Sequence, residues 1–153
     1  MGKRYKSGDT ICKKFTELLE MKYPKIKVNK ESRKDLEKKL TDVFSLFIRA
    51  RDNYTCFTCG IKKSDGAVIQ CGHLLSCVSH STKWDELNCH AQCQPCNWYH
   101  EEHPERYTYM WLKKHGQQQY ELLYAKWNKT TKFTNADIKY LIKYYQDKLK
   151  EVR

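Results

Sequence analysis

The chain has 153 residues, of which 40% are hydrophobic and 31% are charged, and its formal net charge is +11. This length fits one domain with helical additions. No apolar run approaches the roughly 20 residues that a membrane-spanning helix needs. The first residues also lack the apolar stretch of a secretory signal. We therefore expect a cytoplasmic protein with no membrane partner.

The positive charge lies mainly at the two ends of the chain. The net charge is +7 over residues 1–50, −2 over residues 51–103 and +6 over residues 104–153. Basic flanks attract a polyanion, and nucleic acid is the natural polyanion for a basic protein. Solvent-facing lysine-rich helices would account for the same charges, so the charge alone does not identify a partner.

The first strong element is a helix over residues 33–51. A basic N-terminal segment precedes it, in which residues 11–23 are compatible with a short helix ended by Pro24. Ser32, with Asp35 three residues later, is typical of a helix N-cap. Apolar residues then recur at helical spacing and predict one buried stripe: Leu36, Leu40, Val43, Phe44, Phe47 and Ile48.

The middle of the chain predicts a small hairpin. Residues 67–71 are short, apolar and β-branched, which favours a strand, and residues 86–93 alternate as its partner would. About a dozen polar residues join the two and predict a loop, whose length is typical of functional loops. A helix is expected after Cys96.

The C-terminal third predicts helices. Pro104 is suited to begin one and Gly116 to end it, while Thr134 with Asp137 marks the start of another. Six aromatic side chains in this region favour packing against a core, with stacking on nucleic-acid bases as the alternative: Tyr107, Tyr109, Trp111, Tyr120, Tyr124 and Trp127.

Two CxxC pairs predict a metal centre. Cys56 and Cys59 form the first pair, Cys93 and Cys96 form the second, and 33 residues separate the pairs. Two such turns supply the four thiolates of a tetrahedral Zn²⁺ site. A redox role is less consistent, because no βαβ pattern of the thioredoxin kind surrounds either pair. We expect a structural zinc that stabilises the hairpin, since few apolar residues lie between positions 54 and 103.

Three polar residues are distributed over this predicted strand, loop, strand and helix. His73 ends the first strand, Asn88 lies on the second, and Asn97 follows the last zinc cysteine on the first turn of the helix. This order resembles the HNH, or ββα-metal, nuclease motif. The resemblance implies that His73 is the general base, that Asn88 orients it or holds the loop, and that Asn97 binds a divalent cation, Mg²⁺ or Mn²⁺.

The stretch from Lys39 to about residue 125 resembles the phage NinG family, which includes the Rap recombination endonucleases of lambdoid phages. The resemblance is carried by the runs "DVFSLFIRARDNYTCFTCG", "QCGHLLS", "WDELNCHAQCQPCN" and, more weakly, "LLYAKW". It implies a DNA endonuclease that acts on branched recombination intermediates, such as Holliday junctions.

One position departs from the HNH pattern. Many HNH enzymes carry an Asp or His directly before the base as a second cation ligand, and Gly72 stands there. Either the cation is bound weakly or another residue replaces this ligand, with His90 on the second strand as the first candidate. His100 and Glu101, about one helical turn from Asn97, are further candidates. A solvated polar side chain is the alternative interpretation of each.

The sequence thus predicts an α+β fold that is mostly helical. A zinc-bound ββα-metal core of hairpin and helix would be flanked by N- and C-terminal helices. Its segments would be a basic N-terminal segment (1–32), the nuclease domain with its leading helix (33–125) and a basic C-terminal helix (126–153).

The predicted function is cleavage of branched DNA, with a homodimer as the assembly suited to symmetric cutting. Two alternatives remain: a zinc-dependent module that binds DNA junctions without cutting them, favoured by Gly72, and an RNA nuclease on the same scaffold. The predicted phosphate contacts are Arg49, Arg51 and Lys83.

Overall fold

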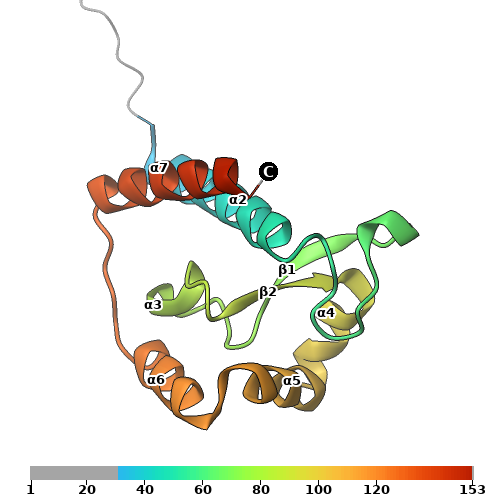
Figure 1. Ribbon diagram of the computed structural model, residues 1–153. Coiled ribbons are helices and arrows are strands. Elements are labelled where there is room, and N and C mark those ends of the chain that lie inside the picture. Colours follow the sequence, from blue (N-terminus) through green and yellow to red (C-terminus); the bar gives the residue numbers. More distant parts are fainter. Residues whose placement is uncertain (1–30, 153) are drawn as a thin grey trace, which may run out of the picture. The chain divides into compact units, whose positions relative to one another are not determined.

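A computed structural model describes the structure of residues 31–152. Ser32–Arg153 forms one compact unit, which is mixed α and β and mostly helical. The expectations for residues 1–30 lie outside the described residues. Figure 1 shows the elements in chain order: α2 (Arg33–Arg51), the 3₁₀ turn η1 (Lys63–Asp65), β1 (Ile69–His73), α3 (His80–Lys83), β2 (Cys89–Cys93), α4 (Gln94–Glu102), α5 (Glu105–His115), α6 (Gln117–Trp127) and α7 (Asn135–Glu151).

Helix α2 begins and ends where the sequence predicts. Ser32 and Asp35 form a reciprocal capping box, in which each side chain accepts a hydrogen bond from the other residue's main-chain N–H. The predicted stripe is buried except for Val43, which is half-buried. Burial of this stripe is the main reason that the helix is stable, since helix propensity alone contributes little.

Helix α7 covers the apolar stripe of α2, and the two helices lie side by side in Figure 1. Thr134 and Asp137 form a second capping box, as predicted. The ring of Tyr145 meets that of Phe44 edge-on, with centroids 4.9 Å apart, and donates a hydrogen bond from its hydroxyl to the carbonyl of Trp84. The sequence separated residues 126–153 as a segment of their own, whereas α7 belongs to the same compact unit as the hairpin.

Strands β1 and β2 form an antiparallel hairpin with a clear division between its two faces. Gln70 pairs with Gln92 and Gly72 pairs with His90, so the side chains at these positions share one face. The alternate positions share the other face, where Cys71 and Cys89 belong to the core of α2 and α7. Both strands begin later than the sequence predicts, at residues 69 and 89.

The hairpin lies between two helical layers. In Figure 1, α2 and α7 lie on one side of it, and α4, α5 and α6 lie on the other. A second apolar cluster fills this other side and includes Leu74, Tyr107, Trp111 and Leu123. Tyr107 and Trp111 are fully buried, which confirms packing for these two aromatic residues.

The segment that joins the strands was expected to be a loop, but it contains the short helix α3. Its inner side chains explain the difference, because Ser81 and Thr82 are buried. Ser81 donates a hydrogen bond to the main-chain carbonyl of Lys129, and Ser79 donates one to Trp127. Among residues 31–152, no helix is both long and apolar enough to cross a lipid bilayer.

Candidate metal centre and active site

The four cysteines of the CxxC pairs meet in one place. Their sulfur atoms all lie within 4.8 Å of one another. Cys59 Sγ and Cys93 Sγ, from different pairs, are 3.7 Å apart, which is too long for a disulfide. Four sulfurs at about 2.3 Å from a tetrahedral Zn²⁺ would lie about 3.8 Å from one another. The four cysteines therefore fit a zinc-like metal ion.

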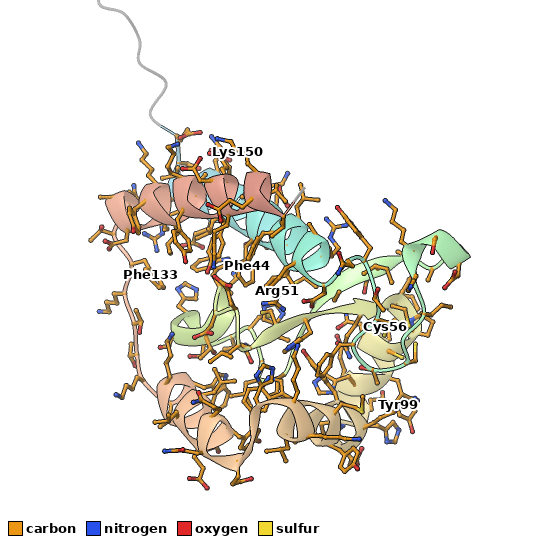
Figure 2. All side chains as sticks on the ribbon, viewed as in Figure 1. Phe44, Arg51, Cys56, Tyr99, Phe133 and Lys150 are labelled. Carbon is orange, nitrogen blue, oxygen red and sulfur yellow. The ribbon has the colours of Figure 1, made fainter. Side chains whose placement is uncertain are left out.

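The loop after α2 presents the first pair in a tight turn. Cys56, labelled in Figure 2, donates its main-chain N–H to Ile61, and Gly60 donates to the carbonyl of Cys56. Gly60 has a φ of 80°, a conformation that glycine adopts without strain. Burial would raise the pKa of the Cys56 thiol, but main-chain N–H groups of Cys93 and nearby residues lower this pKa to about 7. These N–H groups thus favour the thiolate of Cys56, the form that binds metal, whereas burial raises the pKa of Cys93 and of Cys96.

His73 is held by the segment that connects the strands. Its Nε2 lies 3.0 Å from the main-chain carbonyl oxygen of Lys83. Because a carbonyl oxygen only accepts, Nε2 carries the proton and Nδ1 carries the lone pair. Burial lowers the pKa of His73 from 6.5. The ring is therefore neutral at pH 7, with an accepting nitrogen.

Asn88 holds the same segment from within. Its side chain is fully buried directly before β2. It accepts a hydrogen bond from the Leu75 N–H (2.8 Å) and donates to the carbonyls of Leu75 (3.0 Å) and Thr82 (3.1 Å). Thr82 precedes Lys83, whose carbonyl binds His73. Asn88 thus fixes the backbone that orients His73, although it was expected on the strand itself.

Asn97 shares a cavity with His73. Helix α4 begins at Gln94, earlier than expected, so Asn97 lies within its first turn and a half. Its Nδ2 donates to Gln70 Oε1 over 2.9 Å, which fixes the orientation of the amide. A cavity of about 460 Å³ is lined by both residues and by Cys71, Leu74, Ser76, Cys77, His100, Glu101 and Pro104.

His100 connects α4 to the end of β1. Its Nε2 donates to the main-chain carbonyl of His73 over 3.1 Å. Its Nδ1 is buried and has no hydrogen-bond partner among the described residues. Glu101, one residue further, is exposed and lines the same cavity, four residues from Asn97. The helix therefore contributes an amide and a carboxylate to the lining of the cavity that His73 also lines.

His90 lies elsewhere. It is fully buried, stacks on Phe57 with ring centroids 4.1 Å apart, and does not line the cavity of His73. Its Nδ1 lies 3.2 Å from the Tyr107 hydroxyl and its Nε2 lies 3.3 Å from His115 Nε2. With both nitrogens hydrogen-bonded, His90 offers no lone pair to a cation in this arrangement, contrary to the expectation from the sequence.

The residues expected to contact phosphate have other partners. Figure 2 shows Arg51 at the end of α2, where it bonds to Asp52 and to the carbonyls of Glu86 and Cys89. Arg51 therefore connects α2 to β2, a structural role that the sequence did not indicate. Arg49 donates to the carbonyl of Ser45, and the Lys83 ammonium lies 5.0 Å from the centre of the Trp84 ring.

Gln92, which the sequence did not single out, lies beside Gly72 and Asn97, although it does not itself line the cavity of His73. It is fully buried, its Nε2 donates to Thr58 Oγ1 over 2.8 Å, and its Oε1 has no hydrogen-bond partner among the described residues. A Cβ added at Gly72 would lie 1.8 Å from Gln92 Oε1 and 2.9 Å from Asn97 Oδ1. A glycine inside a strand is a signal of such close approach.

Comparison with known proteins identifies the family. No curated protein and no solved structure matches the chain. The family model described as Bacteriophage Lambda NinG protein matches residues 6–153. This match spans nearly the whole chain, including the metal centre and the cavity. The chain therefore belongs to the Bacteriophage Lambda NinG protein family.

Proposed function

We propose that this NinG-family protein is a divalent-metal-dependent endonuclease of the HNH type that hydrolyses phosphodiester bonds in branched DNA. The observation that carries the proposal is the arrangement of His73 and Asn97. A neutral imidazole with a free lone pair and an amide held by Gln70 line one cavity, next to a site for zinc.

His73 serves as the general base in this proposal. Its Nδ1 accepts the proton of the attacking water, while its Nε2–H continues to donate a hydrogen bond to the carbonyl oxygen of Lys83. Asn88 keeps this carbonyl in place through its hydrogen bonds to Leu75 and Thr82. The ring therefore needs no reorientation before it accepts the proton.

Asn97 and Glu101 provide the oxygen ligands of α4 for a hard cation. Bound Mg²⁺ or Mn²⁺ would supply positive charge for the phosphate and for the departing oxygen. The amide of Asn97 is a weak ligand alone, so the substrate phosphate and water complete the set. His100 donates a hydrogen bond to the main-chain carbonyl of His73 and so fixes the position of α4 relative to the general base.

The choice of branched DNA rests on the family and on charge. The NinG family supports a role in phage recombination. The basic segments that flank the hairpin suit contacts with phosphates outside the cavity. Arg49 and Lys83 remain proposed DNA contacts; Arg51 is proposed only as a structural residue. Two copies of the chain would suit paired cuts across a junction.

A substrate panel tests the proposal. The purified protein is incubated with a four-way DNA junction, a linear duplex and single-stranded RNA, each with Mg²⁺ and with a chelator too weak to remove zinc. Mg²⁺-dependent cleavage of the junction is expected. Binding of the junction without cleavage would instead identify a binding module, and preferential cleavage of RNA would identify an RNA nuclease.

A further inference from the structure

We propose that Gln92 supplies a further protein oxygen ligand of the catalytic cation, beside those of α4, in the place that a side chain at position 72 would otherwise fill. The inference rests on the proposed function, because the cation is the one that would serve cleavage. It concerns a residue on the opposite strand from His73, and it explains why Gly72 precedes the base.

The first observation is an unpartnered oxygen. Gln92 Oε1 is buried and accepts no hydrogen bond from the described residues. Buried polar atoms without a partner are uncommon in proteins, and each calls for an ordered water, an ion or another explanation. The other end of the amide is satisfied, because Nε2 donates to Thr58 Oγ1.

The second observation is the direction of this oxygen. Gln92 Oε1 and Asn97 Oδ1 lie 1.8 Å and 2.9 Å from the point where a Cβ of residue 72 would be. The sum of these distances, about 4.7 Å, is the upper limit of the separation of the two oxygens. Two oxygens bound to one Mg²⁺ lie about 3 Å apart when adjacent and about 4.2 Å apart when opposite. The limit is compatible with both arrangements.

The third observation is that both amides are fixed. Asn97 donates its Nδ2 to Gln70, and Gln92 donates its Nε2 to Thr58. Each amide therefore directs its oxygen toward the point where a Cβ of residue 72 would lie, and Gln92 Oε1 largely fills this point. Carbonyl-type oxygens are the ligands that hard cations prefer, and two of them lie close together here.

Thr58 gives the arrangement a link to the metal centre. It lies between Cys56 and Cys59 in the first CxxC turn, and its hydroxyl holds the Gln92 amide. The zinc site would then orient Gln92 as a ligand of the catalytic cation as well as stabilise the hairpin. Residues that orient ligands in this way affect metal affinity.

The test measures Mn²⁺ binding to the full chain with its cysteine site loaded with zinc, in the absence of DNA. Electron paramagnetic resonance of free Mn²⁺ gives the affinity. Gln92→Met, which keeps the length of the side chain and removes the oxygen, should weaken binding about tenfold or more. Gln92→Glu should bind at least as tightly as the wild type, because it adds a charge. Gln94→Met is the matched control and should leave the affinity unchanged.

A second measurement needs no variant at position 92. In the wild-type protein, Mn²⁺ should broaden the side-chain carbonyl ¹³C resonance of Gln92 at concentrations that leave the resonance of Gln94 sharp. A sharp Gln92 signal at saturating Mn²⁺, or wild-type Mn²⁺ affinity in folded Gln92→Met, would overturn the inference. The unpartnered oxygen of Gln92 would then bind a water or belong to an amide with a purely structural role.

Failure of the inference and failure of the proposed function give different results. Cleavage that depends on His73, together with Mn²⁺ binding that is independent of Gln92, would reject only the role of Gln92 as a cation ligand. Mn²⁺ binding that depends on Gln92, in a protein that cuts none of the substrates, would support Gln92 as a cation ligand and reject the proposed nuclease activity.

Discussion

His73 and Lys83 are joined by a hydrogen bond of 3.0 Å from the imidazole Nε2 to the main-chain carbonyl oxygen. This one contact determines the tautomer of the ring, because the carbonyl oxygen only accepts. It also leaves the Nδ1 lone pair as the basic site of the cavity that Asn97 shares. The segment between the strands is therefore part of the proposed active site.

The pH dependence of cleavage should reflect the buried base. Burial lowers the pKa of His73 from 6.5, and the unprotonated ring is the active form. We therefore expect kcat/KM for a junction to remain constant as the pH falls toward about 6.5 and to decline only at more acidic pH. The measurement is a pH–rate profile with zinc content monitored at each pH. An acidic limb with its midpoint above 6.5 would contradict this environment for His73.

Asn88 should be important for both stability and cleavage. Asn88→Ala leaves the Leu75 N–H and two carbonyls without their side-chain partner, and each unsatisfied buried group costs about 1–3 kcal/mol. Cleavage should fall as well, because the Lys83 carbonyl loses its support. Urea unfolding and junction cleavage measure the two effects.

Asn128→Ala is the control for this prediction. Asn128 is exposed and bonds only within its own turn of α6, so its removal should change stability by less than about 0.5 kcal/mol. Equal stability of the Asn88 and Asn128 variants would show that Asn88 does not hold the segment.

The zinc site should be required for the hairpin. The apolar cluster beside the zinc cysteines is small, so Cys93→Ser should abolish zinc binding and unfold the region from about residue 54 to residue 103. Cys77→Ser is the matched control, since Cys77 is exposed and outside the cluster. Zinc content and the thermal transition are measured together. A Cys93→Ser protein with unchanged Tm and zinc content would refute a structural role.

His90 should make the fold sensitive to acid. Burial lowers the pKa of His90 to about 3 from 6.5. Because the unfolded chain takes up a proton near pH 6.5 and the folded chain does not, the free energy of unfolding should decrease as the pH falls from 6.5 toward about 3.

His90→Phe should weaken this dependence, because the phenyl ring stacks on Phe57 but does not titrate. His103→Phe, at an exposed position, should keep the wild-type slope. Urea unfolding at a series of pH values gives both slopes. A His90→Phe slope as steep as that of the wild type would assign the acid sensitivity to other groups.

Local sequence signals predicted much of this fold. The capping pairs at Ser32 and Thr134 and the apolar stripe of α2 identify helices from neighbouring residues alone. The spacing of the cysteines likewise predicted a cluster that the structure brings together. These features depend on contacts within a few residues or on a recurring metal geometry.

The parts that could not be predicted depend on contacts between distant residues. His90 was expected beside a cation, yet Tyr107 and His115, from a helix that follows it, occupy both of its nitrogens. Arg51 was expected on a phosphate, but it binds carbonyls that reach it only once β2 is in place. Periodicity does not indicate such partners.

The central claim is tested most directly by cleavage of a four-way junction by His73→Ala in the presence of Mg²⁺. His103→Ala, an exposed histidine outside the cavity of His73, is the control. His73→Ala should still bind the junction but cut it about 10²- to 10⁴-fold more slowly, while His103→Ala should cut at the wild-type rate. Undiminished cleavage by His73→Ala would contradict the assignment of His73 as the base.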